Sequence, residues 1–239
     1  MSRTGPVLGR FLAIGYLMML PQVVFAQVCG VLDPELQGQY SGECVDGLAN
    51  GKGEAAGIAK YRGEFRAGRK QGNGIKNWPW GDSYQGHFFN DQMDGQGRFV
   101  WSLAGSRAGE QYQGSFVANR REGAGEYRWS TGESLITEWQ ADLPVGLVDR
   151  HLYDRLIARL RADAEAQNAV GRTGVKACRT VKMGISEREW ITGVVVAVRG
   201  QSVEIMIDSS GPSPKILAGV ELKKGAVLWD AIRDWKPCI

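Results

Sequence analysis

The sequence is short of the residues and motifs that carry enzyme chemistry. Among 239 residues there are two histidines, His87 and His151, and four cysteines. No Gly-x-Ser-x-Gly elbow, His-Glu-x-x-His pair or phosphate-binding loop occurs, so spacing identifies no nucleophile with its base and no nucleotide site. Glycine pairs such as Gly72 and Gly74 are not followed by Gly-Lys-Ser/Thr, and turn geometry explains them. We therefore predict no catalytic residue, no metal, no cofactor and no enzymatic activity.

An excess of one charge is also lacking. The chain has 29 Lys and Arg against 26 Asp and Glu, and without residues 1–26, which carry Arg3 and Arg10, 27 basic residues face 26 acidic ones. Nucleic-acid binding depends on clustered positive charge that neutralises phosphates. We therefore predict no nucleic-acid partner.

The longest apolar run is short and lies near the N-terminus. Residues 11–20 form it, two arginines come before or at its start, and residues 24–26 read as a small-x-small cleavage site. This is the pattern of a secretory signal peptide over residues 1–26, since the run is too short to span a bilayer comfortably. An uncleaved anchor is the alternative. We expect an exported protein, periplasmic or secreted; signal style and cysteine use favour a bacterial source over a secreted eukaryotic one.

Glycine, in contrast, is abundant, with 33 residues, and it recurs with tyrosine at a fixed spacing. Four tyrosines each open a phrase Tyr-x-Gly-x-aromatic, except that the first has Cys44 in the aromatic place. A Gly-x-Gly pair follows 11 and 13 residues after each tyrosine, and a tryptophan follows 17 residues after the last three. The tyrosines are Tyr40, Tyr61, Tyr84 and Tyr112. A fifth, worn copy begins at Leu135, so the pattern indicates a tandem repeat of about 23 residues.

This pattern resembles the MORN repeat (membrane occupation and recognition nexus), whose unit reads roughly Tyr-x-Gly-x-Trp/Phe-x-x-Gly-x-x-x-Gly-x-Gly. The resemblance covers a little under half of the chain. Departures are Cys44, then Asp91 and Asn119 at the glycine seven residues after the tyrosine, and an insert over residues 103–110. The resemblance implies a scaffold associated with protein assembly, dimerisation and phospholipid binding, with the repeated tyrosines, glycines and aromatic residues acting mostly as fold determinants.

Strand alternation predicts the same architecture. Within residues 61–65, Tyr61, Gly63 and Phe65 share one face of a strand, and the residues between them take the other. A turn containing Gly68 then reverses the chain, and a second strand carries the tryptophan. Residues 38–146 should therefore form a single-layer antiparallel sheet of hairpins with an aromatic ladder on one face, and residues 27–37 should cap its start.

The rest of the chain predicts a helix and a second, smaller β domain. Apolar residues recur every three or four positions over residues 147–170, which indicates an amphipathic helix that caps or links the array. A membrane-surface or partner-binding helix is the alternative. Residues 171–176 read as a linker. Alternating runs over residues 192–200 and 201–208 predict a hairpin in a small SH3-like or OB-like barrel over residues 177–239.

Four cysteines in an exported chain suggest two disulfides, with three possible connectivities. Cys29 and Cys44 flank the start of the array, and Cys178 and Cys238 bracket the last 60 residues, so we favour pairing within each group. A zinc site is the alternative, but its spacings are wrong.

Two surfaces are candidates for binding. The first is the aromatic face, where we expect packing to claim most rings and uncovered rings to form a groove for a peptide, glycan or partner helix. Its residues are Tyr61, Phe65, Trp78, Tyr84, Phe88, Trp101, Tyr112, Phe116 and Trp129. The second is the line of hairpin tips, where two basic pairs should lie about 19 Å apart and could meet an anionic lipid surface. These are Arg69, Lys70, Arg120 and Arg121.

The leading hypothesis is a non-catalytic exported scaffold that presents the sheet to an envelope protein. One alternative is a peripheral phospholipid binder that uses the basic tips. The other is an enzyme that acts on a glycan or wall polymer through the aromatic face.

Overall fold

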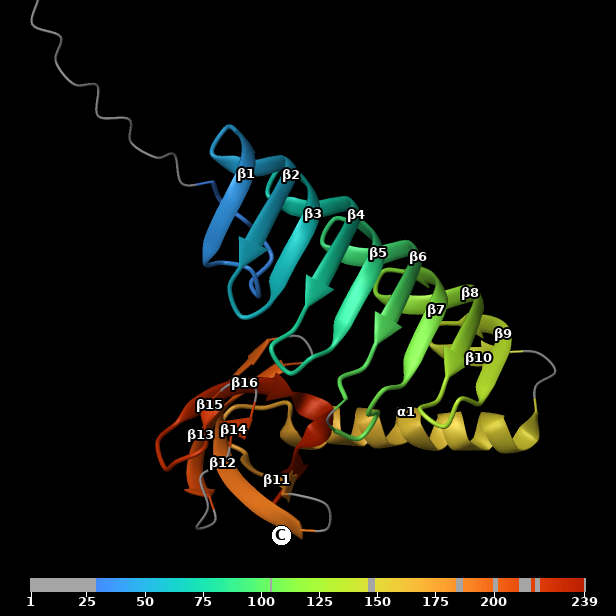
Figure 1. Cartoon of the computed structure of the whole chain (residues 1–239), viewed down its shortest axis with the longest axis vertical. Coiled ribbons are helices and arrows are strands. Elements are labelled where there is room, and N and C mark those ends of the chain that lie inside the picture. Colours follow the sequence, from blue (N-terminus) through green and yellow to red (C-terminus); the bar gives the residue numbers. More distant parts are fainter. Residues whose placement is uncertain are drawn as a thin grey trace, which may run out of the picture.

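The computed structural model describes residues 29–103, 105–145, 149–183, 187–199, 202–210, 216–217 and 220–238, so the predicted signal peptide lies outside the described residues. Ten strands follow one another in a single antiparallel sheet, each paired with its neighbour in the chain (Figure 1). The strands are β1 (Gln39–Val45), β2 (Leu48–Ala56), β3 (Lys60–Arg66), β4 (Arg69–Asn77), β5 (Ser83–Phe89), β6 (Gln92–Val100), β7 (Gln111–Val117), β8 (Arg120–Arg128), β9 (Ser134–Gln140) and β10 (Leu143–Val145). This confirms the predicted hairpin array.

Each repeat is one hairpin with a two-residue tip. In the second repeat, Ala67 and Gly68 both have positive φ, at 48° and 78°. Two central residues with positive φ define the type I′ turn, whose twist matches that of paired strands. Asn90 and Asp91 repeat the geometry in the third unit, with φ of 47° and 72°. The short tip fixes the register of the returning strand.

The recurring spacing of tyrosine and glycine has a packing reason. The Tyr61 ring lies back over its own hairpin, and its hydroxyl donates to the Glu64 carbonyl at 3.1 Å. A Cβ on Gly74 would sit 2.5 Å from the Tyr61 ring, so only glycine fits beneath it. Tyr61 packs edge-to-face on Phe65, with ring centroids 5.0 Å apart, and on Phe88 of the next repeat, at 5.2 Å. Edge-to-face pairs are the favoured arrangement of aromatic rings, so the ladder links each unit to the next.

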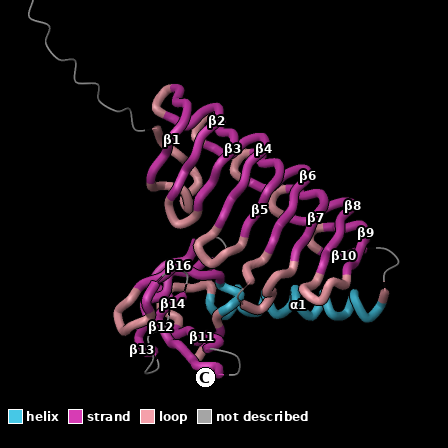
Figure 2. The backbone as a smooth tube through the Cα atoms, in the orientation of Figure 1, coloured by secondary structure: helices cyan, strands magenta, loops and turns pink. Residues whose placement is uncertain are grey.

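Both ends of this single layer are covered by other parts of the chain. At the start, the segment before β1 lies against the sheet with Val31 and Leu36 buried, and Cys29 is bonded to Cys44. Toward the end, helix α1 (Arg150–Val170) runs beside the loops that join the later hairpins (Figure 2). Its Leu156 is buried in the core of the array. A single-layer sheet has little other core, so these covers contribute much of its stability.

The C-terminal part is a second, smaller sheet with its own core. Its strand order is β16-β13-β12-β11-β17, and a separate pair is formed by β14 and β15. The strands are β11 (Lys176–Met183), β12 (Glu187–Arg199), β13 (Ser202–Ser210), β14 (Ile216–Leu217), β15 (Val220–Glu221), β16 (Val227–Ala231) and β17 (Lys236–Pro237), with the short helix η1 (Ile232–Asp234) between the last two. Within the described strands the sheet is open, with β16 and β17 at its edges, and no closed barrel forms.

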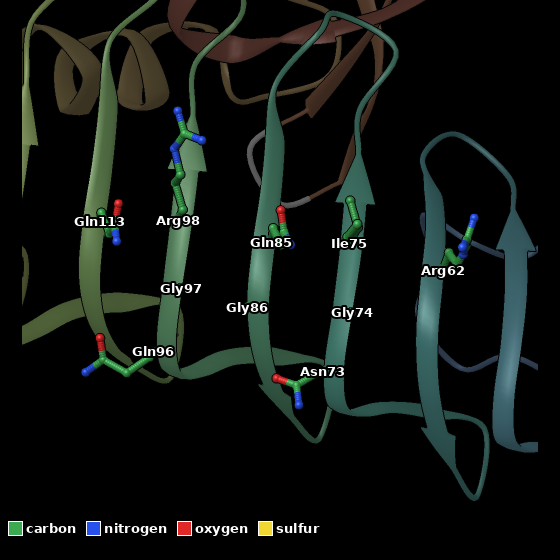
Figure 3. Close-up of a pocket in the computed structure, with 10 residues that line it drawn as sticks. All are labelled: Arg62, Asn73, Gly74, Ile75, Gln85, Gly86, Gln96, Gly97, Arg98 and Gln113. Carbon is green, nitrogen blue, oxygen red and sulfur yellow. The ribbon is translucent and has the colours of Figure 1, made fainter.

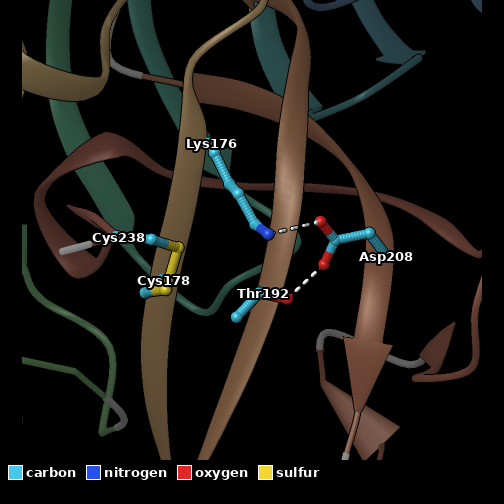
Figure 4. The surroundings of a disulfide bond; sticks show 5 residues. All are labelled: Lys176, Cys178, Thr192, Asp208 and Cys238. Carbon is cyan, nitrogen blue, oxygen red and sulfur yellow. Dashed lines mark hydrogen bonds and ion pairs between the residues drawn. A yellow bond between two sulfur atoms is a disulfide. The ribbon is translucent and has the colours of Figure 1, made fainter.

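The second disulfide ties the end of the chain to this sheet. Cys178 on β11 is bonded to Cys238, and their Cα atoms are 5.1 Å apart (Figure 4). Nearby, Asp208 accepts a hydrogen bond from Thr192 and pairs with Lys176 at 3.6 Å. Both cysteine pairs are at disulfide distance, which fits the expected pairing within each group.

The two sheets are joined by polar contacts. Arg233 of η1 donates to Asp82, in the loop between β4 and β5, at 2.7 Å. Ser202 at the start of β13 donates to Glu35 of the N-terminal segment at 2.8 Å. The C-terminal sheet therefore contacts both the N-terminal cover and the loops between repeats.

Candidate functional site

Most rings of the predicted aromatic surface are core. Seven of the nine are buried, with at most 4% of their surface exposed: Tyr61, Phe65, Tyr84, Phe88, Tyr112, Phe116 and Trp129. Trp78 and Trp101 are partly buried and pack against the same core. The tryptophans lie one residue beyond their strands, in the loops between repeats, and not on the second strand as predicted. There they meet the covering segments, as when Trp78 Nε1 donates to Glu35 at 2.9 Å.

The expectation that both members of each basic pair face solvent at the tips is wrong. The tip is only two residues long, so the pair begins the returning strand, where consecutive side chains take opposite faces. Lys70 stands opposite Phe65 and is 1% exposed, and Arg121 stands opposite Phe116 and is 6% exposed. Only Arg69 and Arg120 remain exposed for contact with a lipid surface.

The tips instead form a hydrogen-bonded ladder between repeats. Asp91 Oδ1 accepts from the Lys70 backbone N–H at 2.8 Å, and the Asp91 N–H donates to the Lys70 carbonyl at 3.1 Å. The same exchange joins two further pairs, Asn119 with Met93 and Asp142 with Arg121. The acidic residues thus stand beside basic side chains of the preceding repeat, and the neutral Asn119 stands beside a methionine. The departures from the repeat pattern at this position are therefore contacts between units.

Buried charges close the N-terminal end of the aromatic face. Asp33 pairs with Lys70 and, at 2.8 Å, with Lys76, which also pairs with Glu35 at 2.8 Å. Burial alone would raise the pKa of Asp33, but the ammonium groups of Lys76 and Lys70 outweigh it and lower that pKa to about 2. The pKa of Lys70 is lowered by burial and by repulsion from Lys76. This cluster therefore holds the N-terminal segment on the sheet.

Farther along the same face a groove of about 800 Å³ stays open. We call it the aromatic groove. It lies between the sheet, α1 and η1, and its apolar lining consists of Met93, Phe99, Trp101, Tyr112, Phe116, Leu143, Leu160, Ala164 and Ile232. Its size falls within the ~300–1,000 Å³ typical of ligand sites. Six of the nine predicted rings do not line it and pack in the core of the array instead: Tyr61, Phe65, Trp78, Tyr84, Phe88 and Trp129.

Arginines and carboxylates line the same groove. Arg107 lies over the Trp101 ring at 4.8 Å and pairs with Asp163 of α1 at 2.5 Å. Arg121 lies over the Trp139 ring at 4.4 Å, and its Nε donates to Asp142 at 2.9 Å. Burial raises the pKa of Asp163, and the charge of Arg107 opposes that shift. The groove thus combines aromatic walls with fixed, buried cations, a pattern that sequence spacing did not reveal.

The opposite face carries a shallower trough of about 620 Å³ (Figure 3). Its floor is a row of glycines in register, including Gly74, Gly86 and Gly97, because each repeat aligns its glycines with those of the next. Polar side chains flank the floor: Arg62, Asn73, Gln85, Gln96, Arg98 and Gln113. The trough is wide open and lacks the buried cations and aromatic walls of the aromatic groove.

The repeats agree with a known family. The family model described as MORN repeat matches residues 61–83, 84–102 and 112–134. No curated protein matches the chain. None of the helices in the described part of the chain is long and apolar enough to cross a membrane. The chain therefore contains MORN repeats, three of which are matched between residues 61 and 134.

Proposed function

We propose that the protein is an exported, non-catalytic scaffold whose aromatic groove receives a protein partner of the cell envelope. MORN repeats point in general to binding or scaffolding. The observation that carries the proposal is the groove itself. The chain's own segments cover the aromatic face at one end, but about 800 Å³ beside α1 remains open and lined by rings. Aromatic and arginine side chains are the residues most enriched in the energetic centres of protein interfaces.

Two features support export. The N-terminal residues read as a signal peptide, and all four cysteines are paired within the described chain, Cys29 with Cys44 and Cys178 with Cys238. Disulfides persist in oxidising compartments and are rare in the cytosol. Mass determination of the protein purified from its native compartment should give a chain that begins at Gln27.

The alternatives have weaker support. A lipid surface would meet only Arg69 and Arg120 at the tips, and Arg69 is already paired with Asp91 at 3.0 Å. An enzyme acting on glycans needs a pair of carboxylates at the bond that breaks. In the aromatic groove, Asp142 and Asp163 are each held by an arginine.

Site-specific photo-crosslinking in intact cells tests the proposal. A benzophenone amino acid at Leu143, which lines the groove and is 50% exposed, should give a discrete adduct with an envelope protein. The same group at Ile136 serves as the control, because Ile136 is 76% exposed and does not line the groove. Equal labelling at both positions, or no protein adduct at Leu143, would contradict the proposal.

A further inference from the structure

We infer that the occupant of the aromatic groove is an extended, acidic segment of the partner protein that carries bulky apolar residues between its acidic ones. This inference rests on the proposed function, because it names the chemistry of the partner that the groove receives. Three observations carry it: the balance of charge, the unpaired donors and the placement of polar groups along the groove.

The lining has more positive than negative charge. Four arginines line the groove against two carboxylates: Arg107, Arg120, Arg121 and Arg233, with Asp142 and Asp163. Three of the arginines are buried, with 3%, 7% and 9% of their side chains exposed for Arg107, Arg121 and Arg233. Charge complementarity across an interface steers association and excludes partners of like charge. Each buried arginine already pairs with a carboxylate, and Arg233 does so with Asp82, which does not line the groove. The exposed Arg120 is therefore the cation that favours an acidic ligand.

Each of the buried arginines keeps a donor without an acceptor. Within the described residues, Arg107 Nε, Arg121 Nη1 and Arg233 Nε are buried and make no hydrogen bond. A buried donor without a partner is costly, and a charge-assisted bond to a carboxylate is among the strongest it can form. Because these atoms are buried, a carboxylate of an acidic segment would satisfy them after the arginine side chains turn toward the groove.

The polar groups lie toward both ends of the groove, with rings between them. Arg120 belongs to the hairpin tip between β7 and β8, and Arg233 belongs to η1, beside α1 at the opposite end of the strands (Figure 1). Phe116 and Phe99 line the wall between. An acyl lipid carries its charge at one end only and would leave the other end unmatched. A peptide beside the seven residues of β7 rises about 3.4 Å per residue and can place carboxylates at both ends.

The test is selection from a library of random twelve-residue peptides displayed on phage, panned against the mature protein with its disulfides intact. The proposal expects enriched sequences in which Asp or Glu flanks Leu, Phe or Trp. The best peptide, made synthetically, should bind with an affinity that falls as salt rises, because its charges are screened. Enrichment of neutral or basic sequences, or of none, would overturn the proposal.

Variants locate the binding. Arg120→Glu and Leu143→Glu change exposed residues that line the groove, so folding should be kept, and each should weaken the peptide about tenfold. The matched controls are Arg69→Glu, which has the same place in its own repeat, and Val45→Glu, which is 53% exposed at the other end of the array. The controls should stay within about twofold of the wild type, since rim positions outside the contact contribute little. Equal loss in the variants and the controls would refute the assignment.

A competing anion separates this proposal from a lipid site. Dodecanoate, a single-headed acyl anion, should displace the selected peptide poorly; displacement at equal concentration would make the groove an acyl-anion site and overturn the proposal. In cells, the Leu143 photo-crosslinker can be combined with Arg120→Glu. If the adduct is unchanged, the scaffold function still holds but the partner segment is not acidic. If no adduct forms at all, the proposed scaffold function is wrong.

Discussion

The pair of Arg121 and Asp142 is one rung of the hydrogen-bonded ladder between hairpin tips. Its geometry allows a quantitative prediction about the stability of the array. Arg121 is 7% exposed in its side chain and pairs with Asp142 at 2.9 Å, and its Nη2 also donates to the Asp142 carbonyl at 3.1 Å. Asp142 has a φ of 73°, which asparagine also tolerates, so Asp142→Asn removes the charge and little else. Arg121 would then keep a buried positive charge without its counterion.

The size of the effect follows from burial. Removing one partner of a fully buried ion pair costs about 3–5 kcal/mol. Because 42% of the Asp142 side chain is exposed, water offsets part of the loss, and we expect Asp142→Asn to cost about 2–3 kcal/mol. The double variant Arg121→Met with Asp142→Asn recreates the composition of the neighbouring rung, Met93 with Asn119. It should lose only about 1 kcal/mol, since replacing both partners removes the unpaired charge.

Urea unfolding followed by tryptophan fluorescence and by far-UV circular dichroism measures these differences, provided that both disulfides stay intact. The prediction is an ordering: the double variant is more stable than Asp142→Asn alone. Two results would refute this reasoning: an unfolding free energy of Asp142→Asn within about 0.5 kcal/mol of the wild type, or a double variant less stable than Asp142→Asn. Either would show that the pairing of Arg121 with Asp142 does not stabilise the array.

Three further predictions concern the core of the array and the N-terminal segment that covers it. Gly97→Ala should lower the unfolding free energy by at least about 2 kcal/mol, because its Cβ would lie 2.5 Å from the Tyr84 ring; thermal melts would show this. Asp33, whose pKa is lowered from 3.8 to about 2, binds a proton more readily when unfolded, so its contribution of about 2 kcal/mol is present above pH 4 and lost as pH falls toward 2. Asp33→Asn should remove that part of the acid dependence, measured by urea unfolding at pH 5 and pH 2.5. Replacing Cys29 and Cys44 by serine opens a loop of 15 residues and should cost about 3 kcal/mol in the same urea assay.

The repeat architecture could be predicted because its determinants are local. Tyr61, Gly63 and Gly74 recur at spacings that specify strand, turn and strand, and the rings then stack by translation. The inward position of the second basic residue at each tip is also implied by the register of the repeats. Lys70 and Arg121 share their place in the repeat with Ala49, which is buried, so the position faces the core.

The aromatic groove could not be predicted in the same way. It depends on where α1 and η1 come to lie, and those positions are set by contacts far apart in the sequence, such as Arg107 with Asp163 and Asp82 with Arg233. Periodicity finds the faces of an element but does not say which other element covers them. The rings that remain uncovered are therefore a property of tertiary packing.

The charged residues of the aromatic face explain why the covering stays incomplete. Rings alone would favour full closure, since every uncovered ring forfeits burial of apolar surface. Arg107 and Arg121 sit among those rings, and a helix packed tightly over them would have to supply acceptors for all of their N–H groups. Helix α1 supplies Asp163 to Arg107, whereas Arg121 pairs with Asp142 of the sheet and takes no acceptor from the helix. The arrangement that keeps these arginines partly hydrogen-bonded also keeps the groove open.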